Sequence, residues 1–114
     1  MPVSSNSQSA SKEWGATIPG GYASYDSEQI TADGLKILTA AKVSAAGSSE
    51  TLVILQVDTA NIRWKVGADA TAALGEQLAA GDSITLELPR VALLALTMYP
   101  VSGTPIVNVQ YLYR

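Results

Sequence analysis

Short apolar runs separated by turn-forming residues dominate the sequence from residue 29 onwards. The runs are five to eight residues long, and Gly, Asp, Asn, Ser or Pro stands between them. Residues 35–43 form the first run, and residues 51–57 form one that is almost continuously apolar and rich in branched side chains. The latter pattern is typical of a central strand that is buried on both faces. Six or seven short strands at this spacing predict an all-β fold: a small, jelly-roll-like β-sandwich or a flattened barrel.

Three further runs alternate between apolar and polar residues, which divides their side chains between two faces. Residues 62–66 place three apolar side chains on one face and Arg63 and Lys65 on the other. Residues 83–88 alternate in the same way, and residues 106–113 place Val and Tyr on one face and Asn and Gln on the other. The two cations could bind a partner carboxylate or a phosphosugar. The alternative is a solvated outer face, with the tryptophan between them in the core.

Two segments, residues 70–80 and 89–98, are rich in Ala and Leu, and their pattern does not separate helix from strand. Pro89 suits the first position of a helix. If residues 89–99 form a strand instead, both of its faces are largely apolar, and a small sandwich has only one core face. One apolar stripe would then meet another subunit or be covered by the arm of its own chain. The candidate interface residues in this segment are Leu94, Leu96 and Met98.

The composition changes near residue 28, which divides the chain into an N-terminal arm (residues 1–28) and a β-sandwich domain (residues 29–114). Twelve of the first 24 residues are Ser, Thr, Asn, Gln or Gly, so this segment has little apolar surface with which to order itself. Its candidate anchors for a docking surface are Trp14, Ile18, Tyr22 and Tyr25. An arm that docks on its own domain or on a neighbouring subunit is one interpretation, and a flexible tail is the other.

Composition also excludes several kinds of chemistry. The 114 residues include no histidine and no cysteine, which removes imidazole and thiolate catalysis, the usual zinc sites and disulfides. The net charge of −3 gives no basic footprint for nucleic acid. The first eleven residues lack the basic and apolar regions of a secretory signal, and the most apolar stretch, residues 91–98, is too short to cross a membrane. We therefore expect a protein that folds in a cytoplasm, with no membrane contact.

No catalytic constellation is found in the sequence. Ser9 and Lys12 match the S-x-x-K spacing, but this match lies in the polar arm and lacks the partner motifs of the enzymes that use it. No phosphate-binding loop or calcium loop is present, and most of the domain's aspartates stand where turns are expected. We predict that the protein is not an enzyme and binds no cofactor or metal.

The segment from residue 51 to residue 87 resembles a family of small structural proteins of tailed-bacteriophage virions. In that family a buried A-L-I-x-V-E strand leads to I-R-[WYF]-x-x-D-G and then to T-A-x-x-G-x-x-L-x-A-G-D-x-[LI]-x-L. Here these elements read LVILQVD (residues 52–58), IRW (62–64) and TAALGEQLAAGDSITL (71–86). The closing A-T-L-N-V-S-Y strand of the family is similar to IVNVQY (106–111). The chain departs from the pattern at Gly67-Ala68-Asp69 and at Ala70, which affects the expected loop conformation more than the fold.

The resemblance implies a compact β-sandwich that serves as a building block of a virion. Together with the absence of catalytic groups, it predicts a capsid decoration, or cement, protein on the capsid surface, assembled in the host cytoplasm. Its expected partners are the major capsid protein and neighbouring copies of itself, in a homo-oligomer. One alternative is a tail, baseplate or fibre component. The other is a carbohydrate- or receptor-binding module, which would require exposed aromatic residues such as Tyr99, Tyr111 and Tyr113. On this division of the chain, deletion of residues 1–28 is predicted to leave a folded, soluble domain.

Overall fold

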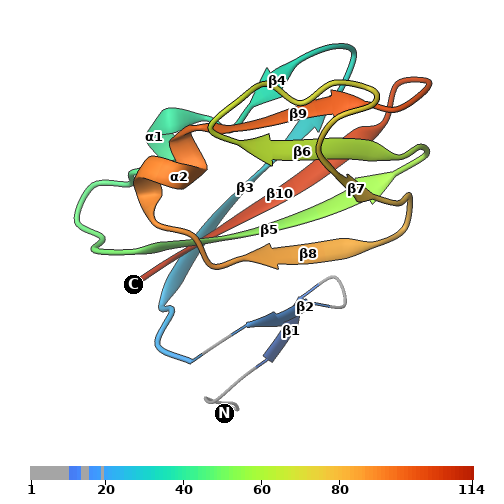
Figure 1. Ribbon diagram of the computed structural model, residues 1–114. Coiled ribbons are helices and arrows are strands. Elements are labelled where there is room, and N and C mark those ends of the chain that lie inside the picture. The colour runs from blue at the N-terminus through green and yellow to red at the C-terminus, as the bar shows by residue number, and fades with distance from the viewer. Residues whose placement is uncertain (1–10, 14–15, 19) are drawn as a thin grey trace.

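Two antiparallel four-stranded sheets pack face to face in the computed structural model, which describes residues 11–13, 16–18 and 20–114 (Figure 1). The first sheet has the strand order β3-β10-β5-β8, and the second has the order β4-β9-β6-β7. The first consists of β3 (Ser24–Thr31), β10 (Ile106–Tyr113), β5 (Thr51–Asp58) and β8 (Ser83–Leu86). The second consists of β4 (Lys36–Ile37), β9 (Leu96–Pro100), β6 (Ile62–Val66) and β7 (Glu76–Leu78). The predicted β-sandwich is confirmed.

The connections give this sandwich the topology of a jelly roll. Every connection between successive strands of the two sheets passes from one sheet to the other, except that between β6 and β7. Two short helices lie in these crossings, α1 (Ala40–Val43) between β4 and β5 and α2 (Arg90–Leu94) between β8 and β9. They contact each other at one end of the sandwich (Figure 1). Eight strands in two such sheets are the jelly-roll arrangement, which covers an apolar face of each sheet with the other.

The core lies between the sheets, as the alternating patterns predict. Val53, Leu55 and Val57 of β5 belong to the main core cluster, while Leu52 and Ile54 face outward and are buried in a second cluster. The central strand is therefore buried on both faces. Strand β10 places its Val and Tyr residues in the main core, and β6 does the same with its three apolar side chains.

Two sequence predictions of strands need correction. Residues 35–43 do not form one strand, because β4 ends at Ile37 and the alanine-rich segment that follows forms α1. Residues 89–99 are neither a strand nor a helix throughout. Pro89 is the N-cap of α2, so the first part of this segment is a helix. Strand β9 begins after that helix, so the second part is a strand.

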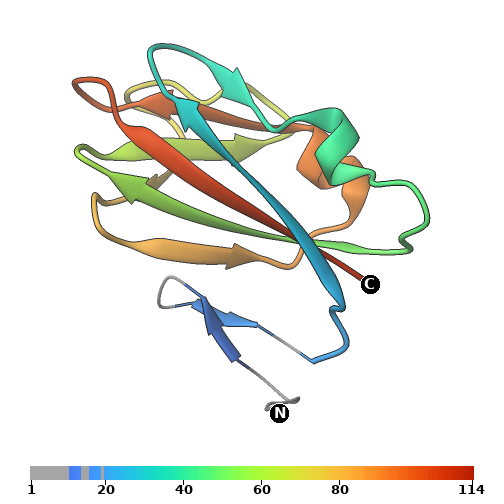
Figure 2. The same cartoon turned by 180° about the vertical axis from the view of Figure 1, so that it is seen from behind.

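A third pair of strands lies outside the sandwich. Strands β1 (Ser11–Glu13) and β2 (Ala16–Ile18) form an antiparallel hairpin beside β8 (Figures 1 and 2). The chain then enters β3, which starts at Ser24 and pairs with β10 over the whole length of both strands. The boundary expected at residue 28 thus falls within β3, whose exposed polar side chains resemble those of the arm in composition. We call residues 11–22, which precede the first sheet, the arm.

Candidate interface

The seven predicted interface residues do not form one surface. Leu96 and Met98 are fully buried in the main core, so their assignment to an interface is wrong. The break in regular structure between α2 and β9 separates them from Leu94, which is 46% exposed. Trp14 lies outside the described residues, and Ile18 lies in β2, where only the backbone is described.

The outer face of β9 is also covered within the chain. From the sequence we expected an apolar stripe here that would need another subunit or the arm as its cover. Thr97, on the outer face of β9, is buried under the loop of residues 67–75. Its Oγ1 accepts a hydrogen bond from the amide of Ala70 at 2.9 Å and donates one to the carbonyl of Ala68 at 3.1 Å. The loop of the same chain thus takes the place that sequence reasoning gave to another subunit or to the arm.

Arg63 holds the same loop in position. Its Nε donates to the carbonyl oxygen of Ala72 at 3.1 Å, and its Nη1 donates to that of Gly75 at 2.9 Å. Gly75 has a φ of 124°, and a Cβ there would lie 2.8 Å from the carbonyl oxygen of Trp64, so the close approach requires glycine. The guanidinium of Arg63 therefore binds backbone carbonyls of its own chain, which favours the structural interpretation of this residue over recognition of a partner carboxylate.

The two tyrosines of the predicted anchor set lie in different surroundings. Tyr25 is 71% exposed on the outer face of β3. Tyr22 is half-buried and packs against Leu52, Ile54 and Leu112, which we call the outer patch. These three residues lie on the face of the first sheet that points away from the core. Tyr22 thus attaches the arm to the domain of its own chain.

Arg114 clamps the junction between the arm and the sandwich. Its Nη2 donates to the carbonyl oxygen of Gly20 at 3.0 Å, and its guanidinium carbon lies 4.7 Å from the centre of the Tyr22 ring. Its Nη1 also forms an ion pair with Glu50 at 2.8 Å. Burial raises the pKa of Tyr22, and the Arg114 charge opposes that shift. Because this ion pair is exposed, it contributes only about 0.2–1 kcal/mol of stability.

A cleft of about 460 Å³ lies beside the clamp. Leu52, Glu87 and Leu88 line it, together with Arg90 and Arg114. Both arginines are already bound within the chain, since Arg90 donates from Nε to the hydroxyl of Thr51 at 3.2 Å and from Nη2 to that of Ser48 at 2.5 Å. These hydrogen bonds hold both guanidinium groups in place at the wall of the cleft.

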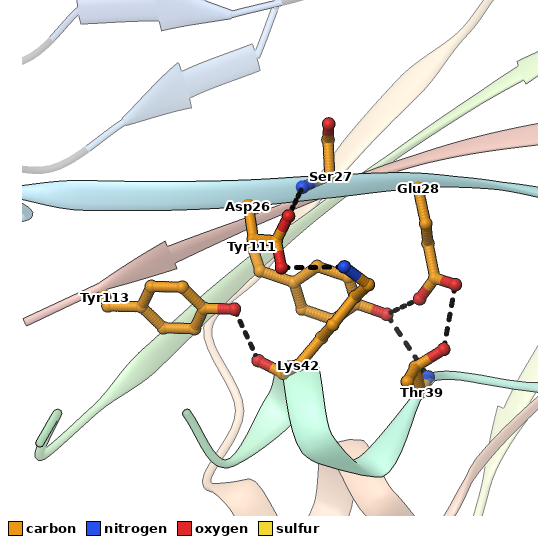
Figure 3. A network of polar contacts seen from close by, with 7 residues as sticks. All are labelled: Asp26, Ser27, Glu28, Thr39, Lys42, Tyr111 and Tyr113. Atoms are coloured by element: carbon orange, nitrogen blue, oxygen red, sulfur yellow. Dashed lines mark hydrogen bonds and ion pairs between the residues drawn. The ribbon is translucent and has the colours of Figure 1, made fainter. Parts of the chain in front are cut away.

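A polar network on the inner side of β3 attaches this strand to α1 (Figure 3). Glu28 accepts hydrogen bonds from the hydroxyl of Tyr111 and from Thr39 Oγ1, the latter at 2.8 Å. The Tyr111 oxygen in turn accepts one from the amide of Thr39 at 3.3 Å. Nearby, Lys42 Nζ forms an ion pair with Asp26 at 2.7 Å. Both acids of β3 thus have partners, and these contacts attach the edge of the sandwich to α1 and to β10.

Removal of the Tyr111 hydroxyl is expected to weaken the fold. Burial, and then the hydrogen bond to Glu28, raise the pKa of Tyr111 strongly, so this hydroxyl stays protonated as a donor. The Tyr111→Phe variant should lose about 1–3 kcal/mol of unfolding free energy, because Glu28 and the Thr39 amide lose a partner. Urea denaturation measures this loss. The matched control is Tyr25→Phe at an exposed site, and equal effects of the two changes would contradict the role of the network.

Acid is expected to weaken the attachment of β3. A hydrogen bond from Lys42, followed by one from the Ser27 amide, lowers the pKa of Asp26 in the folded protein. The stabilisation that this group provides is therefore present above the unfolded pKa and is lost as the pH falls through the folded pKa. Unfolding free energy measured from about pH 6 to about pH 2 should thus fall less steeply in Asp26→Asn than in the parent. An equal flattening in Asp69→Asn, a change in an exposed loop, would contradict this role of Asp26.

The described residues include no cluster of three or more acidic residues that could hold a metal ion, and none of their helices has the length and apolar character to span a membrane. Tyr111 and Tyr113 are buried and Tyr99 is half-buried, so a carbohydrate-binding module loses its best candidates. Sequence reasoning did not identify the outer patch or the Arg114 clamp as a docking place for the arm. The apolar residues on both faces of β5 were the signal that its outer face needs a cover.

Comparison with known proteins adds no relative. No protein-family model matches the sequence, and no curated protein or solved structure matches it significantly.

Proposed function

We propose that this protein is a structural component of a tailed-bacteriophage virion, and that it is a capsid decoration, or cement, protein. It would sit on the capsid surface and bridge subunits of the major capsid protein. The proposal rests on the resemblance of residues 51–87 to virion structural proteins, and a jelly roll is compatible with it because viral capsid domains use this fold. Since the same fold also occurs in lectins and cupins, the fold alone does not decide the function.

The structural observation that supports the proposal is the position of the hairpin formed by β1 and β2. The two sheets bury their apolar faces within the chain, and the hairpin of β1 and β2 lies beside the sandwich as a separate piece (Figure 2). A hairpin that lies outside the two sheets is suited to contact a neighbouring subunit. An arm that contacts several subunits gains affinity from its effective concentration, so modest contacts are enough to reinforce a shell. The carboxylates of β3 are held by Lys42, Thr39 and Tyr111, which is consistent with a structural role for these two acids.

Particles that assemble without this protein provide the test. We expect the purified chain to bind such particles on the head, and the decorated particles to retain their DNA at temperatures at which bare particles release it. The Tyr22→Ser variant should bind more weakly, because the ring that attaches the arm to the outer patch no longer holds the hairpin in position. Lys36→Ala, which removes an exposed ion pair on β4 at the opposite sheet, should bind as the parent does. Binding to tails alone would support a tail component, and no binding to particles would overturn the proposal.

A further inference from the structure

The cleft beside the Arg114 clamp opens where β8 leaves β5. The last residue of β8, Leu86, pairs with Val53, and the chain then turns away into α2. The amide of Val57 donates toward the β8 side, to the carbonyl of Asp82 at 3.2 Å. Alternate residues of a strand direct their backbone groups to the same neighbour, so Thr51 directs its N–H and C=O toward the space that β8 has left. A strand edge along which β8 no longer runs thus faces this cleft of about 460 Å³.

The lining of the cleft carries equal numbers of opposite charges. Glu50 and Glu87 supply two carboxylates, and Arg90 and Arg114 supply two guanidinium groups. Glu50 and Arg114 form an ion pair with each other. Among the described residues, Glu87 has no hydrogen bond or ion pair, and Arg90 bonds to two neutral hydroxyls. An unpaired carboxylate and a guanidinium held in place therefore border the same space.

Apolar and aromatic groups form the rest of the wall. Leu52 is buried, Leu88 and Tyr22 are half-buried, and Pro89 lies at the rim. Burial raises the pKa of Tyr22, and the two carboxylates of the cleft raise it further, so the Tyr22 hydroxyl lies close to both of them. The cleft thus combines an apolar wall with fixed hydrogen-bond donors and acceptors.

This combination favours a neutral ligand that both donates and accepts hydrogen bonds. An anion that is drawn to Arg90 also meets the charge of Glu87, and a cation that is drawn to Glu87 meets that of Arg90. Hydroxyl groups donate to carboxylates and accept from guanidinium groups, while the C–H face of a sugar ring packs on apolar and aromatic side chains. The volume of about 460 Å³ lies within the range of roughly 300–1,000 Å³ of small-molecule sites.

From these observations we propose that the cleft is a binding site for a neutral mono- or disaccharide. Glu87 accepts hydrogen bonds from sugar hydroxyls, and Arg90 donates from Nη1, the nitrogen that its bonds to Thr51 and Ser48 leave unused. The site is separate from the tyrosines of β9 and β10 that the sequence suggested for a carbohydrate-binding module. This inference goes beyond the proposed function and concerns the isolated protein, so it can hold or fail independently of any role in a virion.

Titration of the isotopically labelled full chain with neutral saccharides, followed by NMR, tests the proposal. The probes are glucose, galactose, mannose, N-acetylglucosamine, maltose and lactose. We expect at least one of them to shift the amide signals of residues 49–52 and 87–90 saturably, with a dissociation constant in the millimolar range. Inorganic phosphate and glucose 6-phosphate should bind no more tightly than that sugar.

A matched pair of variants tests the role of the unpaired carboxylate. Glu87→Ala should weaken binding of the same sugar roughly tenfold, because a hydrogen bond to a charged acceptor is lost. Glu87 is exposed, so the urea midpoint of this variant should match that of the parent. Glu76→Ala removes an exposed carboxylate on β7 of the other sheet and should leave the affinity unchanged.

Four results would overturn the proposal. They are the absence of a saturable shift with every sugar, shifts that map outside the cleft, undiminished affinity in Glu87→Ala, and tighter binding of inorganic phosphate or glucose 6-phosphate than of the neutral sugar. The last result would assign the cleft to anions.

Discussion

Replacement of Leu96 by alanine is expected to lower the unfolding free energy by about 2–5 kcal/mol, the usual range for a leucine truncated in a core. Leu96 is completely buried in the main core cluster and lies on β9, a central strand of the second sheet. Truncation leaves a cavity that the two packed sheets cannot close fully. Urea denaturation with an unchanged slope would measure the loss as a shift of the midpoint.

The matched control is the neighbouring leucine that lies outside the core. Leu94→Ala changes a side chain that is 46% exposed at the end of α2, so the unfolding free energy should change by no more than about 0.5 kcal/mol. Equal losses in the two variants would contradict the placement of Leu96 in the core and of Leu94 on the surface. If Leu96→Ala weakened association while stability stayed the same, the interface assignment made from the sequence would be restored.

Two truncations should differ strongly in stability. Deletion of residues 1–22 uncovers the outer patch but leaves β3 complete, so we expect a cooperative fold that loses about 1–3 kcal/mol and self-associates. Deletion of residues 1–28 also removes Asp26, Glu28 and more than half of β3, which uncovers Tyr111 and the edge of β10. Small domains have an unfolding free energy of roughly 5–15 kcal/mol, and this deletion should remove a large part of it. We therefore expect the shortened chain to lack a cooperative unfolding transition. Circular dichroism and thermal unfolding of both variants measure the difference.

The two truncations share the loss of the arm, so each serves as the control for the other. The sequence alone predicted a folded domain after deletion of residues 1–28, because the polar composition of residues 24–28 does not differ from that of the arm. In the structure these residues pair with β10, and we therefore expect the opposite result. A stable, cooperative fold after deletion of residues 1–28 would contradict the importance of the β3 network.

The regular strands of the sandwich could be predicted from the sequence, because the alternation of apolar and polar residues follows from which face of each strand is buried. The alternation in β6 and β10 assigns their core faces correctly, and the continuous apolar run of β5 predicts burial on both sides. These patterns arise from the pleat of a strand, which is a local property. The alternation patterns alone therefore predict the all-β fold class.

The interface residues could not be predicted in the same way, because their surroundings are set by distant parts of the chain. Alternation at Leu94, Leu96 and Met98 indicates two faces but does not say which one is the core, and α2 ends before the strand begins. The Arg114 clamp joins residues 94 positions apart. The cover over Thr97 depends on how the loop of residues 67–75 folds back, which turn residues alone do not encode. The sequence therefore indicated that apolar faces need covers without showing which segment covers each.

A reconstruction of purified virus particles, together with the copy number of this protein on a gel, tests the central claim most directly. A capsid cement protein should be present in hundreds of copies near parity with the major shell protein, as density between shell subunits into which the jelly roll fits. A few copies confined to the tail or to one vertex would contradict the cement role and support a tail component. Complete absence from the particles would contradict the virion role altogether.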